Sequence, residues 1–181
     1  MRKVLGLSMM AIFAVACATQ PSLRDYQATS LDEQKIVNLV LEFQEAYSSQ
    51  NAERILATYA PNAMIKTSMT KETKKRDWSG VMLPKEEHAA ILLSKQIDFY
   101  KRVKIKLEIY RPEEIFIKRN EASMTASYEL YSTNPYKAYV ETGILYFKFR
   151  KSDSGWLISK RTWEILDCNH PDFNEWKKKQ Q

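Results

Sequence analysis

The sequence predicts an α+β domain in which helices come first and the strands of an antiparallel sheet follow. Between residues 31 and 59, apolar side chains recur every three or four positions, which is the period of one helix face. From residue 103 to 166, apolar and polar side chains alternate within segments separated by short turns, which indicates strands with one buried face. Helices followed by a run of strands are typical of the α+β class.

The first predicted helix begins at Leu31 and has one apolar face. Ser30 and Glu33 have the S-x-x-E spacing of a capping box, in which each side chain accepts a hydrogen bond from an otherwise unpaired backbone N–H group. The apolar residues that follow recur at helical spacing and therefore share one side of the helix. These residues are Ile36, Val40, Phe43 and Tyr47.

Two further helices and the first strand are indicated by the residues at their ends. Asn51 is a good N-cap residue for a short helix carrying Tyr59, and Pro61 ends this helix before a strand at 63–67. Pro84 suits the first position of a third helix, because its missing N–H group is unpaired there in any case. The sequence therefore predicts three helices before the main sheet.

The remaining strands follow from alternation and turn signals. Pro112 and the two glutamates after it interrupt one alternating segment, which predicts a bulge or bend in a long strand that must curve. Glycine, proline and asparagine mark the later turns. Strands are predicted at 103–109, 115–117, 122–130, 139–149 and 156–166.

This order of elements resembles the nuclear transport factor 2-like superfamily, which includes SnoaL-like cyclases, ketosteroid isomerase and scytalone dehydratase. The long helix, the short helix, the Tyr-Ala-Pro-Asn-Ala segment at 59–63 and the following strand resemble the opening of that fold, and Gly-Trp-Leu-Ile-Ser-Lys at 155–160 is similar to its closing strand. The resemblance covers Leu31 to Asp167. It implies a cone-shaped fold with three N-terminal helices packed on a strongly curved antiparallel sheet, a pocket inside the cone, and a homodimer formed through the sheet face.

The N-terminus predicts a signal peptide. Arg2 and Lys3 precede an uncharged apolar run from Val4 to Ala16. A run of this length is too short for a membrane-spanning helix, which needs about 20 residues. We therefore expect these residues to direct the protein to the cell envelope.

The end of the apolar run resembles a bacterial lipobox. Small residues at 14–16 precede Cys17, although Ala14 stands where leucine is usual. The resemblance implies a lipid anchor at Cys17, and Ala18 after it favours the outer membrane, facing the periplasm, in a Gram-negative cell. An ordinary secretory signal with an incidental Cys17 is the alternative. The predicted divisions are a lipoprotein signal peptide (1–16), a lipidated cysteine and flexible tether (17–30), the nuclear transport factor 2-like domain (31–167) and a C-terminal tail (168–181).

Composition argues against several classes of function. The net charge is +6 at pH 7, but no basic stripe with regularly interleaved aromatic residues indicates nucleic-acid binding. The chain has four glycines and no glycine-rich phosphate loop. Cys168 and His170 form a C-x-H pair without the second pair that a closed zinc site needs. We therefore predict no metal, no cofactor and no nucleic-acid partner.

The resemblance also allows the family's catalytic positions to be compared. It places the catalytic aspartate of ketosteroid isomerase at Thr67 and its oxyanion-binding tyrosine at Phe43. Thr67 is not a base near neutral pH and Phe43 has no hydrogen-bond donor. Steroid isomerase activity is therefore not expected.

Other side chains remain as candidates for a site. His88 and Glu164 are candidate bases, although a histidine near the start of the third helix more often faces solvent than the interior. Alternation does not decide whether Arg161 or Glu164 faces the cone, because each shares a strand face with apolar residues. Tyrosines combine an apolar ring with a hydroxyl group, which suits a pocket for a small amphipathic ligand, although such rings are also common in cores. The candidate ligand-binding residues are Tyr128, Tyr131, Tyr139, Trp163, Arg161 and the candidate lid residue Trp78.

The sequence supports two functional hypotheses. The first is a membrane-anchored, non-catalytic domain that binds a small hydrophobic ligand or assembles with other proteins. The second is a SnoaL-like enzyme that performs acid–base chemistry on a small hydrophobic substrate, with His88 or Glu164 as the base and a tyrosine as the donor. A buried base beside a hydroxyl group would favour the second.

Overall fold

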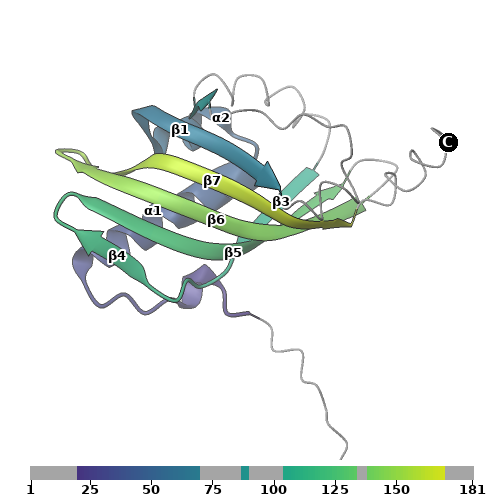
Figure 1. The fold of residues 1–181 in the computed structure, drawn as a ribbon, viewed down its shortest axis with the longest axis horizontal. Coiled ribbons are helices and arrows are strands. Elements are labelled where there is room, and N and C mark those ends of the chain that lie inside the picture. Colours follow the sequence, from purple (N-terminus) through teal and green to yellow (C-terminus); the bar gives the residue numbers. More distant parts are fainter. Residues whose placement is uncertain (1–19, 70–86, 90–103, 134–137, 170–181) are drawn as a thin grey trace, which may run out of the picture.

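A computed structural model describes residues 20–69, 87–89, 104–133 and 138–169. In this part of the chain, the strands form one seven-stranded sheet, and α1 crosses one of its faces (Figure 1). The sheet order is β2-β1-β7-β6-β5-β3, with β4 also paired to β5. The elements are a 3-10 turn η1 (Leu23–Asp25), helices α1 (Leu31–Ser48) and α2 (Ala52–Ala57), and strands β1 (Tyr59–Met69), β2 (Glu87–His88), β3 (Lys104–Ile109), β4 (Ile115–Lys118), β5 (Glu121–Thr133), β6 (Ala138–Ser152) and β7 (Gly155–Asn169).

The predicted α+β class is confirmed, and the sheet differs from the expectation in one pairing. Strand β1 runs parallel to β7, whereas the other paired strands are antiparallel. Alternation along a strand reports which face is buried and not which distant strand lies beside it. The direction of a pairing between the first and last strands was therefore not visible in the sequence.

The predicted bend in the edge strand is confirmed. β3 pairs with the second half of β5 and β4 pairs with its first half, so the two are one edge strand broken at the segment containing Pro112. Proline cannot donate a backbone hydrogen bond, and this break leaves it outside the strand ladder. The break also opens the edge of β5 where the N-terminal segment approaches.

Two predicted boundaries are wrong. Helix α2 ends at Ala57, and Tyr59 already begins β1, because its ring is buried against the core instead of continuing a helical face. Glu87 and His88 form β2 beside β1, where they pair with Ile65 and Met64, instead of the first turn of a helix. Ala89 is helical, and the remainder of the predicted third helix lies outside the described residues.

Helix α1 packs on the sheet through the predicted apolar stripe. The side chains of this stripe, Ile36, Val40, Phe43 and Tyr47, are all buried. The Ser30 hydroxyl oxygen accepts a hydrogen bond from the Glu33 amide, as predicted for an N-cap. The Glu33 carboxylate differs from the prediction, because it accepts its bonds from the backbone and hydroxyl of Thr29.

Asp32 joins the start of α1 to the last two strands. Its carboxylate accepts hydrogen bonds from the Lys151 ammonium, at 2.8 and 2.9 Å, and from the Trp156 indole, at 3.0 Å. These bonds lower the pKa of the Asp32 carboxyl, because they favour its charged form. The contact fixes the first turn of α1 over the turn between β6 and β7.

Residues 20–30 correct the expectation of a flexible tether. Leu23 is fully buried, and the η1 turn around it is closed by a capping box between Ser22 and Asp25. The Arg111 amide donates a 2.8 Å hydrogen bond to the Pro21 carbonyl. The burial of Leu23 acts together with these hydrogen bonds to hold the segment, and composition did not signal it.

At the other end, β7 extends to Asn169, so the backbone of Cys168 belongs to the sheet instead of the predicted tail. The rest of that tail lies outside the described residues. Within the described residues, no helix combines the length and apolarity required to cross a membrane.

Candidate functional site

A bulge in β7 decides which side chains of this strand face the interior. Lys148 pairs with Lys160 and the adjacent Phe149 pairs with Ile158, so β7 has one residue more than β6 at this point. The extra residue reverses the alternation, because side chains on the two sides of a bulge fall out of phase. The inward-facing residues of β7 are therefore Trp156 and Ile158 before the bulge and Arg161, Trp163 and Ile165 after it.

Arg161 lies in the interior among aromatic rings. Its side chain is only 2% exposed, and its guanidinium carbon lies 4.9 Å from the ring centroid of Trp163 and 5.3 Å from that of Phe43. The Nε and Nη1 atoms have no hydrogen-bond acceptor, and no ion pair joins Arg161 to a carboxylate among the described residues. Ring faces attract a cation but do not accept its N–H groups as an anion does. Arg161 is therefore a buried cation that has no anionic partner among the described residues.

A buried carboxyl group lies at the indole N–H of Trp163. Glu141 of β6 is 8% exposed, and its Oε1 atom accepts hydrogen bonds from the Tyr128 hydroxyl at 2.7 Å and the Trp163 indole N–H at 2.8 Å. The indole N–H also contacts the Tyr128 hydroxyl oxygen. Burial raises the pKa of the Glu141 carboxyl, and the two hydrogen bonds oppose this effect. Glu141 is thus a buried acid next to a phenol.

We expect Glu141→Gln to change the pH dependence of stability. Because the pKa is raised in the folded state, the proton on Glu141 stabilises the fold fully below the unfolded-state value near 4.5, and this contribution is lost as pH rises through the folded-state pKa. The glutamine variant keeps the oxygen acceptor and cannot ionise. Measured by urea unfolding across this pH range, the free energy of unfolding should decline less with rising pH in Glu141→Gln than in the wild type. Glu164→Gln is the matched control, and an identical decline in wild type and Glu141→Gln would contradict this assignment.

Gly143 makes room for this cluster. It pairs with Tyr128 across β5 and β6. A β-carbon at Gly143 would lie 2.8 Å from the Tyr128 ring and 2.0 Å from the backbone oxygen of Glu164. The absence of a side chain therefore lets the Tyr128 ring lie over β6 with its hydroxyl directed at Glu141.

Trp163 connects the two buried ionisable side chains. Its ring packs against Arg161, and its N–H group bonds to Glu141. Further rings come from α1, β1 and β6, so that the cluster joins the helix to the sheet. These are Phe43, Tyr47, Tyr59 and Phe147. We call Arg161, Glu141, Tyr128, Trp163 and these four rings the interior cluster.

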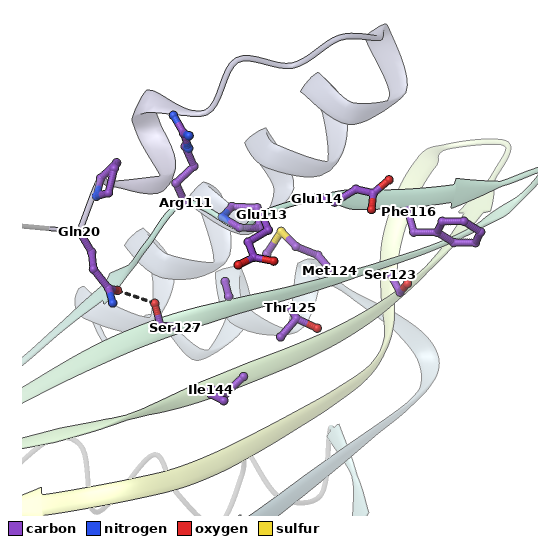
Figure 2. Close-up of a pocket in the computed structure, with 13 residues that line it drawn as sticks. Gln20, Arg111, Glu113, Glu114, Phe116, Ser123, Met124, Thr125, Ser127 and Ile144 are labelled. Atoms are coloured by element: carbon purple, nitrogen blue, oxygen red, sulfur yellow. Dashed lines mark hydrogen bonds between the residues drawn. The ribbon is translucent and has the colours of Figure 1, made fainter.

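A second feature is a groove on the surface, shown in Figure 2. It has a volume of about 620 Å³ and lies between the N-terminal segment, the β3–β4 connection and the outer face of β5. The Ser127 hydroxyl donates a 2.6 Å hydrogen bond to the Gln20 side chain across it. Arg111, Glu113 and Phe116 line the same groove. Its lining mixes polar, charged and apolar side chains, whereas the interior cluster is mainly aromatic.

No protein-family model and no curated protein matches the sequence. Solved structures, however, share its architecture. An NTF-2 like protein from Shewanella oneidensis has a TM-score of 0.54 at 16% identity, covering 74% of this chain and 98% of that one. A Novosphingobium aromaticivorans protein provisionally assigned as a scytalone dehydratase has a TM-score of 0.61 at 9% identity, covering 76% and 85%. The domain has the nuclear transport factor 2-like fold.

A third similar structure, provisionally assigned as an aromatic ring hydroxylase of the same Novosphingobium species, has a TM-score of 0.64 at 13% identity and covers 81% of this chain and 99% of that one. These identities are low, so the comparison concerns the fold. Within the nuclear transport factor 2-like fold, the interior cluster occupies the space between α1 and the curved sheet.

The structure brings together three of the predicted ligand-binding residues. Tyr128, Trp163 and Arg161 all belong to the interior cluster. Tyr131 instead projects from the opposite, exposed face of the sheet, where its hydroxyl bonds to Glu129. The Tyr139 side chain, Trp78 and the predicted lipidation site Cys17 lie outside the described residues.

The two predicted bases lie away from the interior cluster. His88 is exposed on the edge strand β2. Glu164 is on the outer face of the sheet and accepts a 2.9 Å hydrogen bond from Tyr146. The described residues contain no group of three or more potential metal ligands.

Glu141 is the residue that sequence reasoning missed. It shares a strand face with Leu145, Phe147 and Phe149, which are apolar and buried. A carboxylate on the dry face of a strand is costly to bury, and it is therefore a signal of a polar cluster. The alternation along 139–149 places Glu141 on the apolar face of the strand, so this signal was present in the sequence.

Proposed function

We propose that this protein is a lipid-anchored envelope protein, acylated at Cys17, whose nuclear transport factor 2-like domain binds a small amphipathic anion through the interior cluster. The observation that carries the ligand proposal is Arg161, a buried cation with two nitrogen atoms that have no acceptor. Leaving such N–H groups unpaired in a buried site costs free energy, which an anionic ligand would offset. The surrounding rings suit the apolar part of the same ligand.

The anchor is supported by the sequence alone. The charged n-region, the short apolar run and the small residues before Cys17 favour lipidation. With Ala18 after the cysteine, we propose the outer membrane as its location in a Gram-negative cell.

Native mass spectrometry tests both the lipid anchor and the ligand. The sample is the processed lipoprotein, purified from its own cells and released from detergent micelles. We expect a mass increase from acyl chains on the N-terminal residue and a separate non-covalent small mass that is lost in Arg161→Gln. Arg150→Gln, at an exposed position, is the matched control and should retain that mass. An acylated protein with no retained molecule, or one that Arg161→Gln retains equally, would exclude the ligand proposal and leave the anchor intact.

Glu141 and Tyr128 favour a second candidate, an acid–base enzyme. A carboxyl with a raised pKa beside a phenol is a common acid–base arrangement. Under this second hypothesis, the bound anion is a substrate, and Glu141 exchanges a proton with it. Incubation of the retained molecule with wild type would then give a product of different mass, and Glu141→Gln would bind without converting it.

The exposed sheet face supports a homodimer as a further proposal. Tyr131 and Tyr146 are exposed on it. Exposed aromatic side chains are enriched at protein interfaces.

A further inference from the structure

We propose that one edge of the domain lies directly against the lipid surface. This edge, the N-terminal edge, comprises residues 20–25 and the β3–β4 connection at 110–114. The proposal rests on the proposed lipidation of Cys17, and it adds a fixed orientation of the domain to that anchor. Three observations carry it.

The first observation is that the chain is attached to the domain from Gln20 onward. The Gln20 side chain accepts a hydrogen bond from Ser127, Pro21 accepts one from the Arg111 amide, and Ser22 forms a β-bridge with Tyr110. Leu23 is fully buried. These contacts fix the start of the described chain on the β3–β4 connection.

The second observation is the length of chain that remains. Gln20 follows Cys17 by three residues, which span at most about 11 Å when fully extended. Acyl chains on Cys17 would lie in the hydrocarbon layer, so Gln20 would lie at or near the headgroups. A tether of this length does not lift the domain away from the bilayer.

The third observation is the distribution of exposed apolar side chains. Leu31 and Phe116 are the most exposed large hydrophobic side chains of the described residues, at 71% and 58%. Both line a concave surface that adjoins the N-terminal edge, and Phe116 also lines the groove in Figure 2. Exposed apolar side chains close to an acyl anchor can enter the bilayer interface and add to its affinity.

The opposite edge of the sheet should face away from the membrane. Figure 1 shows β1 and α2 on the far side of the sheet from β4 and the N-terminal segment, in agreement with the strand order. Glu113 is an exposed position in the N-terminal edge, and Asn62 is an exposed position on β1. They form a matched pair for a labelling experiment.

The test uses the full lipoprotein, with Cys168→Ser as the background, reconstituted in vesicles of phosphatidylethanolamine and phosphatidylglycerol. Glu113→Cys should react with a polyethylene-glycol maleimide several-fold more slowly than Asn62→Cys. Inserting a flexible linker of about ten residues after Thr19, which extends the reach by roughly 17 Å, should restore the rate at Glu113→Cys.

Equal rates at the two positions in vesicle-bound protein would overturn the proposal while leaving the anchor intact. Slow labelling at Glu113→Cys that persists with the inserted linker would also overturn it and would indicate a second copy on this edge. A protein that lacks the acyl mass and does not float with the vesicles would overturn the anchor and this proposal together.

Discussion

Replacing Gly143 by alanine is expected to destabilise the protein by about 3 kcal/mol or more, a loss that few single substitutions cause. The added methyl group would lie 2.0 Å from the Glu164 carbonyl oxygen and 2.8 Å from the Tyr128 ring. The first neighbour is backbone of the adjacent strand and has no rotamer with which to move away. The sheet must therefore shift at the strand pair that holds the interior cluster.

Urea unfolding of Gly143→Ala measures this effect, and Gly155→Ala provides the comparison. A β-carbon at Gly155 would meet nothing within 4 Å, but its φ of +120° is unfavourable for other residues. Strain of this kind costs about 1–3 kcal/mol. Gly143→Ala should lower the free energy of unfolding by at least as much, because its methyl group overlaps neighbouring atoms. A stability within about 0.5 kcal/mol of wild type, the range of ordinary surface substitutions, would show that Tyr128 does not lie over Gly143 as described.

Arg161→Met is expected to stabilise the unliganded domain by about 1 kcal/mol or more while abolishing ligand retention. A buried charged group replaced by an apolar side chain of similar volume is often a gain in stability, because the cost of removing the charge from water disappears. Methionine fills much of the same space and packs well against rings. Stability and function would thus change in opposite directions at one residue.

Equilibrium unfolding of ligand-free protein tests this prediction. Arg150→Met, at an exposed position, should change stability by less than about 0.5 kcal/mol. If Arg161→Met instead lowers stability by several kcal/mol in the absence of ligand, the contacts of Arg161 with the rings of Phe43, Tyr59 and Trp163 are structural, and the residue is not kept for an anion.

Parts of the interior cluster could be predicted from the sequence, and parts could not. Tyr128 and Trp163 were found as aromatic residues on strands, and Arg161 as a polar residue on the last one. Glu141 had a sequence signal that was missed. No sequence signal indicated the orientation of the Arg161 side chain, because the β7 bulge depends on how β6 and β7 align.

The sequence by itself determined the helical stripe of α1, the α+β class and the break in the edge strand. Each of these rests on local periodicity or on turn and cap residues, which act over a few positions of the chain. Only the tertiary structure decided that β1 runs parallel to β7, that Leu23 is buried and holds the N-terminal segment, and that Arg161 and Glu141 both contact Trp163. These features depend on contacts between residues far apart in sequence, which periodicity does not encode.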